Sequence, residues 1–526
     1  MPVALTINTQ TTNCALGASL FDCAEQLGVR VPTSCRTQGK CKECMVEIAE
    51  GMDCLAPPTE FEKHLQPPFR LSCQALVAAA EGHIRCHTMR RGQMRIEEQA
   101  EGLRSFVVAP DSRASGYGLA MDLGTTTVVL RLYHLATGTL VASASFENPQ
   151  RFGGSDIMAR IQYDTEHPGK LLRRTLAGYL THAIEEFPVD PQNIGEMVVV
   201  GNSTMRDVFF RLSVHSIGQS PYRSLTELEM AEGKRPTTSL VETGRRCLLP
   251  IHPQARVYGA PIISGHVGAD AAACMLAVDL AREDRLVAIM DIGTNTELIV
   301  GNRHRILAAS CPAGPAFEGG AISCGMPALD GAIENVAIDD AGNVHLDVIG
   351  GGAPQGICGS GLVALLSELL RTGRMNERGR FEHDIEKVVF DSAGEIYFVE
   401  SDVNELAQAK GANAAGLQVV LSNYGASFED IEVFYLAGGF GRHMNVDAAM
   451  RIGLLPRIPR ERIVQAGNAA IEGASMALLS AARRAEMESL VRRVEHCRLE
   501  THPQFFDFFV DGCLFQPIGS AAGATP

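Results

Sequence analysis

The stretch that decides the fold occurs twice, as Met121-Asp-Leu-Gly-Thr-Thr-Thr127 and as Met290-Asp-Ile-Gly-Thr-Asn-Thr296, with identical residues at five of seven positions. Each copy follows a run of apolar residues and precedes another, at 128–132 and at 298–300. Short apolar runs bounded by turn residues are typical of buried strands. The sequence therefore predicts the same strand–loop–strand unit in both halves of the chain.

The repeat extends beyond this loop. Each half later contains an apolar strand that ends in glycine, and then a strand that runs into a helix rich in small residues. The predicted elements are strands at 197–201 and 262–265 with a helix at 268–280, and strands at 433–438 and 463–467 with a helix at 468–480. We therefore expect one βββαβαβα unit used twice, an arrangement that normally encloses a cleft.

The repeated loop has the residue types that hold a nucleotide phosphate. An aspartate at a strand end can bind magnesium, usually through water, and the glycine lets the chain bend close to a phosphate. Threonine hydroxyls and turn amides then donate to the phosphate oxygens. Two such loops on equivalent strands indicate that a nucleotide is held from both sides. Glycines later in the second half let the backbone lie flat against an adenosine. The candidate residues are Asp122, Gly124, Thr125, Thr126, Thr127, Asp291, Gly293, Thr294, Asn295, Thr296, Gly438, Gly439 and Gly441.

Four cysteines near the N-terminus form a second chemical signal. Cys35, Cys41 and Cys44 lie within ten residues, and Cys73 follows after 28 intervening residues. A [2Fe–2S] cluster needs four thiolates, two per iron, and Gly39 in this loop allows a tight turn whose amides can point at the sulfurs. Zinc bound by four cysteines also uses C-x2-C pairs, so zinc stays open at this point, as do four unrelated buried thiols.

The surroundings of these cysteines resemble a plant-type or adrenodoxin-type ferredoxin. Pro32-Thr-Ser-Cys35 and Arg70-Leu-Ser-Cys-Gln74 carry the resemblance, and the first gap of five residues is that of the adrenodoxin-like branch. Within the same region we expect strands at 3–9, 45–48 and 84–89 and a helix at 19–27 capped by Ser19. Cys54 is the only other cysteine that could replace Cys73 as a ligand.

Composition narrows the function classes. The formal net charge of −15 repels phosphate backbones, so nucleic acid is not expected as a partner. No apolar run reaches the ~18 residues that span a bilayer, and no secretory signal opens the chain. Fifteen cysteines without an export signal favour reduced thiols over a disulfide framework, so we expect a cytoplasmic protein without a membrane partner.

The duplicated loops resemble the acetate kinase/sugar kinase/Hsp70/actin (ASKHA) superfamily. This resemblance implies that 122–127 is phosphate-1, 291–296 is phosphate-2 and 438–441 is the adenosine motif. It also implies hinge helices that begin near Gly268 and Gly467, where small residues let two helices cross closely. Asp270 is then a candidate for positioning the attacking water, and Glu318 is a second candidate for metal or water.

A [2Fe–2S] domain joined to an ASKHA ATPase resembles the reductive activators of corrinoid proteins over essentially the whole chain. We therefore expect a β-grasp ferredoxin-like domain at 1–94, a linker at 95–115 and two RNase H-like halves at 116–283 and 284–526, the second with a C-terminal extension. In that family 116–200 is often a separate middle domain. The resemblance implies ATP and Mg²⁺ as cofactors, a corrinoid protein and an upstream low-potential donor as partners, and a homodimer.

The activity implied is ATP-dependent transfer of one electron from the cluster to corrinoid Co(II), which restores Co(I). One alternative is electron delivery to another low-potential metalloenzyme. A second is a redox-sensing ASKHA ATPase or a small-molecule kinase, and a third is an electron carrier with an inactive ATPase. A kinase would phosphorylate a metabolite without a corrinoid partner, and a sensor would bind its partners differently when reduced.

Overall fold

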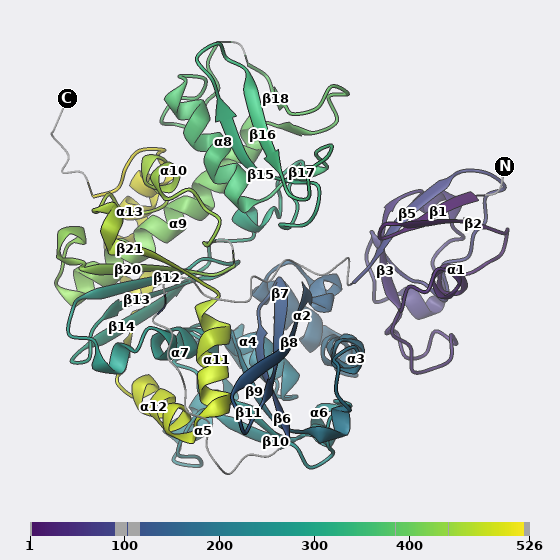
Figure 1. Cartoon of the computed structure of the whole chain (residues 1–526), viewed down its shortest axis with the longest axis horizontal. Coiled ribbons are helices and arrows are strands. Elements are labelled where there is room, and N and C mark those ends of the chain that lie inside the picture. The colour runs from purple at the N-terminus through teal and green to yellow at the C-terminus, as the bar shows by residue number, and fades with distance from the viewer. Residues whose placement is uncertain (1–2, 90–102, 104–115, 384, 440, 520–526) are drawn as a thin grey trace. The chain divides into compact units, whose positions relative to one another are not determined.

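A computed structural model describes residues 3–89, 103, 116–383, 385–439 and 441–519 (Figure 1). These residues form two compact units. The first unit contains the described residues up to Gly259 other than Leu103 and Val200–Ser203. The second contains those residues and the chain from Ala260 onward. The predicted linker at 95–115 lies outside the described residues except for Leu103. Among the described helices, none is both long and apolar enough to cross a membrane.

The N-terminal part of the first unit is a mixed five-stranded sheet with one helix, as the β-grasp prediction requires. Its strand order is β2-β1-β5-β3-β4, with β1 parallel to β5 and the other pairs antiparallel. Ser19 caps the helix as predicted, because its side chain accepts a hydrogen bond from the Asp22 amide. The elements are β1 Val3–Ile7, β2 Gln10–Cys14, α1 Leu20–Gln26, β3 Met45–Glu50, β4 Phe69–Leu71 and β5 His83–Thr88.

The rest of the first unit is built on a six-stranded sheet of order β10-β11-β9-β6-β7-β8. Strands β6, β7 and β8 form an antiparallel meander, and β11 runs parallel to β9. The strands are β6 Tyr117–Leu123, β7 Thr127–His134, β8 Thr139–Glu147, β9 Ile194–Gly201, β10 Leu240–Thr243 and β11 Arg256–Gly259. The helices are α2 Ile157–Glu166, α3 Leu171–Glu185, α4 Ser203–Phe209, α5 Leu225–Ala231 and α6 Gly244–Cys247.

The second unit repeats this arrangement in a sheet of order β21-β20-β12-β13-β14-β22. Its strands are β12 Val287–Asp291, β13 Thr296–Gly301, β14 Ile306–Cys311, β20 Val433–Ala437, β21 Ile463–Gly467 and β22 Val494–His496. Two small sheets are formed by β15 Ala332–Ile338, β16 Val344–Val348 and β17 Gly356–Ile357, and by β18 Val388–Val389 and β19 Tyr397–Phe398. The helices are α7 Ala269–Ala277, α8 Gly359–Arg371, α9 Glu400–Tyr424, α10 Val446–Arg451, α11 Ala469–Leu479, α12 Ala481–Val491 and α13 Phe505–Cys513.

The predicted duplication is therefore present in the strand order. The meander β12-β13-β14 corresponds to β6-β7-β8, β20 takes the place of β9, and β21 takes the place of β11. The strand predicted at 262–265 is wrong, because the equivalent strand is β11. Ile263 and Ser264 instead donate their amides to the Val267 carbonyl and form a turn before α7. Ile262, which is 1 % exposed, fills a core without belonging to a sheet.

Helices α7 and α11 cross within the second unit at backbone contact, as their small residues predict. A Cβ atom added to Gly473 of α11 would lie 2.0 Å from the Ala273 carbonyl oxygen of α7. Eight of the nine α7 residues are buried; Asp270, in the first turn, is the exception. The crossing therefore fixes where Asp270 lies relative to the central strands.

A buried lysine joins α9 to the end of α13. The Lys410 ammonium donates to the carbonyl oxygens of Gly512 and Leu514, the second at 2.7 Å, and lies 5.3 Å from the Phe515 ring centroid. Burial lowers the pKa of Lys410 to about 7. This side chain therefore acts as a C-terminal cap inside the core.

Candidate cluster and nucleotide sites

The four predicted cluster cysteines are arranged as two pairs of thiols. Cys44 immediately precedes β3 and Cys73 follows β4, and the antiparallel pairing of Met45 with Leu71 brings them together. Their sulfur atoms are 3.3 Å apart and both residues are buried. The second pair is Cys35 and Cys41, whose thiols are within hydrogen-bonding reach.

The loop between Cys35 and Cys41 turns its backbone amides toward the sulfurs. Burial alone would raise the pKa of Cys35, but hydrogen bonds to its sulfur, from the Cys41 amide and thiol and from the Lys40 and Gln38 amides, lower it. The hydrogen bond from the Cys44 thiol is the largest cause that lowers the pKa of Cys73 to about 6, and the Gly39 amide adds to it. The chain can adopt this turn because Gly39 has φ +73°.

These donors fit a [2Fe–2S] cluster, which takes two thiolates on each iron. Inward amides favour the negative sulfurs and the extra charge of the reduced state. Elsewhere Cys54 packs against Gly82, where an added Cβ would lie 2.7 Å from its sulfur. Within the described part of the chain, no group of three or more His, Cys, Asp or Glu side chains is gathered as ligands of one ion.

The predicted phosphate-2 loop joins β12 to β13 in the second unit. Asp291 ends β12, and its carboxylate accepts a hydrogen bond from the Cys274 thiol of α7 at 3.3 Å. Desolvation raises the pKa of Asp291 to about 6. Thr294 donates its hydroxyl to the Glu318 carboxylate, so the two predicted residues are in direct contact. The Gly314 amide also donates to the Thr294 carbonyl at 2.9 Å and holds the loop closed.

A third carboxylate lies beside these residues, and sequence analysis did not select it. Glu297 is 5 % exposed in β13, directly after the loop. Desolvation raises its pKa well above the ordinary range, and the charges of Asp270 and Asp291 add to this effect. Asp270 accepts a hydrogen bond from the Ala271 amide at the start of α7. The structure therefore brings Asp270 and Asp291 within electrostatic reach of Glu297.

The predicted adenosine motif begins against the phosphate-2 loop. Gly438 has φ +92°, and an added Cβ would lie 2.5 Å from the Ile292 carbonyl oxygen and 2.9 Å from an Asp291 carboxylate oxygen. Only glycine fits this position without strain. The Gly441 amide donates to the Gly438 carbonyl, whereas Gly439 has open space around its Cα and Phe440 lies outside the described residues.

A second residue missed by sequence analysis holds this glycine turn. The Gln465 side chain in β21 donates to the carbonyl oxygens of Gly441, Arg442 and Met444 at 2.9, 2.9 and 3.0 Å. A polar residue inside an apolar strand is the signal that identifies it, and the same signal identifies Glu297 in β13.

The predicted phosphate-1 loop joins β6 to β7 in the first unit. Asp122 lies near the end of β6, and the Gly124 amide donates to the Thr127 carbonyl at 2.9 Å. An added Cβ at Gly124 would lie 2.7 Å from that carbonyl oxygen, so the turn requires glycine. Asn148 fixes the turn, because its side chain donates to the Gly124 carbonyl at 2.8 Å and its amide donates to the Thr126 carbonyl at 2.6 Å.

Comparisons with known proteins agree with this combination of sites. Three family models match: the 2Fe–2S iron–sulfur cluster binding domain at 5–78, the RACo middle region at 117–283 and the C-terminal ASKHA domain of RACo at 285–521. The solved reductive activator for corrinoid, iron–sulfur protein has the same fold, with a TM-score of 0.70 at 24% identity over 98% of both chains.

Two relatives share most of this length. The [Co(II) methylated amine-specific corrinoid protein] reductase of Methanosarcina barkeri is 25% identical over 422 residues, covering 75% of this chain and 76% of that protein. The corrinoid activation enzyme RamQ of Eubacterium limosum is 32% identical over 465 residues, covering 83% of this chain and 75% of that protein. With its thiol pairs and duplicated ASKHA sheets, the chain belongs to the family of corrinoid activation enzymes.

Proposed function

We propose that this chain is an ATP-dependent reductive activator that passes one electron from a [2Fe–2S] cluster to the Co(II) corrinoid of a partner protein. Cobalt gains one electron and becomes Co(I), and the chain is oxidised by one electron. One observation carries the proposal. A single chain of this family contains two thiol pairs in a ferredoxin-like fold and a group of carboxylates in a duplicated ASKHA fold.

The cluster-domain residues have a defined role in this proposal. Cys35 and Cys41 would hold one iron, and Cys44 and Cys73 the other. The bound cluster supplies one-electron chemistry at low potential. The amides of Gln38, Gly39 and Lys40 stabilise negative charge on the sulfurs, and thereby help to set the potential.

Energy from the nucleotide is needed if the Co(II)/Co(I) couple has a lower potential than the cluster, because the electron then moves against the potential difference. Plant-type clusters have potentials near about −400 mV. If the cobalt couple lies ~100–200 mV lower, moving one electron costs roughly 2.3–4.6 kcal/mol, at 59 mV per tenfold in the equilibrium constant. Differential binding of ATP and its products to two conformations supplies free energies of this order.

In this proposal the carboxylates of the second unit take part in ATP binding and hydrolysis. Asp291 and Glu297 would hold Mg²⁺ through water, because hard cations prefer carboxylate oxygens. Asp270 is the proposed group for orienting the attacking water, and Glu318 is a second candidate for the metal or the water. Thr294, through its hydrogen bond to Glu318, would keep that carboxylate at the phosphate-2 loop.

The wider setting is part of the same proposal. We infer an upstream low-potential protein as electron donor, a cytoplasmic location and a homodimer. None of the fifteen cysteines, all of which the structure describes, forms a disulfide, and this suits a reducing compartment.

A single experiment tests the activity. Reduced, cluster-loaded protein is mixed anaerobically with a Co(II) corrinoid protein, with and without MgATP, and the Co(I) absorbance is followed. We expect Co(I) only with MgATP, and no Co(I) with the D291N or C41S variants. Absence of ATP-dependent Co(I) with the parent protein, or phosphorylation of a metabolite instead, would reject the proposal.

A further inference from the structure

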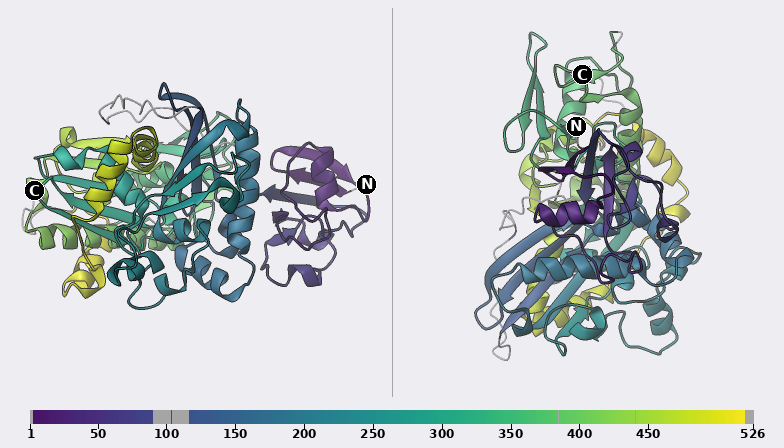
Figure 2. Two further views of the ribbon diagram at one scale, coloured as in Figure 1. Left: turned by 90° about the horizontal axis from the view of Figure 1, so that it is seen from below. Right: turned by 90° about the vertical axis from the view of Figure 1, so that its right-hand side faces the viewer.

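The ferredoxin-like domain contacts the rest of the first unit through the face that carries its cluster loop. Figure 2 shows this domain, in purple, from two further sides. Three ion pairs connect the two parts: Arg174 with Glu43 at 2.8 Å, Arg151 with Glu47, and Arg30 with Glu185 at 3.0 Å. Glu43 stands between the proposed ligands Cys41 and Cys44, so its ion pair with Arg174 is made next to the proposed cluster site.

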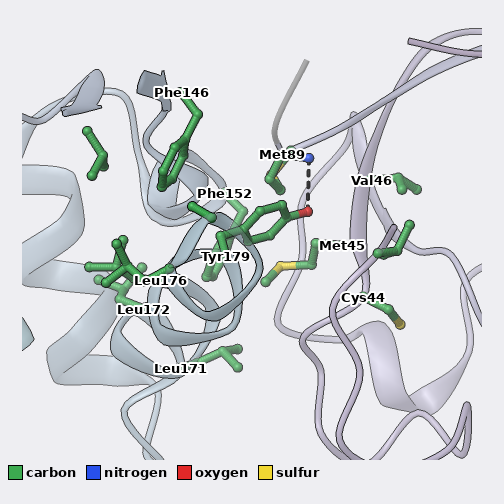
Figure 3. Packing of buried hydrophobic residues seen from close by; sticks show 14 of the residues in the cluster. Cys44, Met45, Val46, Met89, Phe146, Phe152, Leu171, Leu172, Leu176 and Tyr179 are labelled. Carbon is green, nitrogen blue, oxygen red and sulfur yellow. Dashed lines mark hydrogen bonds between the residues drawn. The ribbon is translucent and has the colours of Figure 1, made fainter. Parts of the chain in front are cut away.

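An apolar contact between the two parts accompanies the ion pairs (Figure 3). Tyr179 of α3 is 1 % exposed, and its hydroxyl accepts a hydrogen bond from the Met89 amide at 3.1 Å. Met45 and Met89 are fully buried in the same cluster of side chains. Gly178 lets α3 approach closely, because an added Cβ would lie 3.1 Å from Pro32. The contact is therefore shaped to fit this domain.

The interface has the composition of a reversible dock. Charged pairs accompany a small apolar contact, and the side chains of Arg151 and Arg174 are 21 % and 36 % exposed. Partly exposed pairs of this kind are weak singly and are screened by salt. The chain between Thr88 and Tyr117 is 28 residues long, enough to span on the order of 90 Å when extended. The sequence thus permits the domain to leave the dock.

We propose that Arg151, Arg174, Gly178 and Tyr179, here called the α3 dock, form a docking site for the acidic face of the chain's own ferredoxin-like domain, made of Glu43 and Glu47. Charge holds the docked state. The dock covers the side of the cluster loop on which Glu43 lies, so the domain must leave it before another protein can contact that face. This inference rests on the proposed function only for the reason why the domain leaves the α3 dock, which is to pass an electron to another protein.

The absence of tryptophan from the chain permits a direct test. His182 lies one turn beyond Gly178 on α3, with its ring centroid 6.4 Å from that of Tyr179. In an H182W background the single tryptophan is quenched by the visible absorption of the cluster when the domain is docked. Adding R174E replaces attraction with repulsion, and we expect the docking constant to fall about tenfold, with recovery of emission.

The controls separate charge from general disruption. R223E is the matched variant, because Arg223 pairs with Glu227 at 36 % and 10 % exposure, against 36 % and 11 % for Arg174 and Glu43. We expect R223E to leave the emission unchanged. Raising salt from 0.01 to 1 M shortens the Debye length from about 30 Å to about 3 Å, and should release emission in the parent but not in R174E.

Reversal of both charges decides the result. The double variant E43R/R174E should restore quenching, and if it loses the visible cluster spectrum, R30E/E185R serves as the second exchanged pair. Equal quenching in R174E and the parent, or no restoration in an exchanged pair that keeps its cluster, would overturn the proposal. A negative Co(I) assay would leave these fluorescence results untouched, so failure of the proposed function can be told apart from failure of the dock.

Discussion

The crossing of α7 and α11 offers a sharp test of how the fold positions the nucleotide site. In a G473A variant the new methyl group would lie 2.0 Å from the Ala273 carbonyl oxygen, where ordinary contact begins at 3.4 Å. Backbone cannot rotate away, so the helices must separate by about 1.4 Å. Asp270, in the first turn of α7, would then shift relative to Glu297.

The expected effect on activity is much larger than the effect on stability. A displacement of about 1 Å at a catalytic group can reduce the rate about a hundredfold. Overpacking costs about 1–3 kcal/mol of unfolding free energy, and replacing glycine by alanine in a helix returns about 1 kcal/mol. We therefore expect ATP hydrolysis to fall about a hundredfold, with a loss of stability of about 0–2 kcal/mol and an unchanged cluster spectrum.

A second helical glycine provides the matched control. At Gly416 of α9 the nearest atom to an added Cβ is the flexible Leu298 Cδ1, at 2.6 Å, and no backbone atom is among its nearest neighbours. G416A should therefore keep its ATPase rate. Steady-state hydrolysis and urea unfolding measured on the parent and both variants complete the comparison. Hydrolysis by G473A at the parent rate would refute the argument that this contact positions Asp270.

Three further predictions follow from the described sites. C41S should lose the visible cluster spectrum and keep its nucleotide affinity, whereas C54S should keep both properties. Loss of nucleotide binding in C41S would contradict the prediction that the cluster site and the nucleotide site are independent. Because desolvation raises the pKa of Asp291 to about 6, MgATP affinity should increase as pH rises through 6, and D291N should remove this dependence in calorimetric titrations. Burial lowers the pKa of Lys410 from 10.5 to about 7, so the folded state binds fewer protons than the unfolded state between these values. Stability should then rise with pH by up to about 1.4 kcal/mol per unit in this window, and K410M should abolish that slope in urea unfolding.

Local sequence signals were sufficient for the architecture of both repeats. The paired loops after apolar strands predicted the two meanders, since alternation and turn residues act over a few positions. The strand predicted at 262–265 failed because burial alone does not distinguish a strand from a buried turn. Ser264 closes that turn with its side chain, which accepts a hydrogen bond from the Val267 amide, an interaction that periodicity cannot reveal.

The site residues could be predicted from the sequence only in part. Cysteine spacing could select the four thiols, because three of them are close in sequence. Their arrangement as two pairs is a result of the fold. Glu297 and Gln465 were missed since each lies in an apolar strand and was treated as part of it. The α3 dock could not be predicted from the sequence, because Glu43 and Arg174 are 131 residues apart and only the tertiary structure brings their charges together.

Gly438 limits how this chain can change its choice of nucleotide. Its Cα faces both the Ile292 backbone and the Asp291 carboxylate, so the turn proposed for the base and the aspartate proposed for the metal share one contact. A larger residue at this glycine would displace the proposed metal ligand. Selection for a different purine would therefore have to act on more distant residues such as Gln465, or accept a slower turnover.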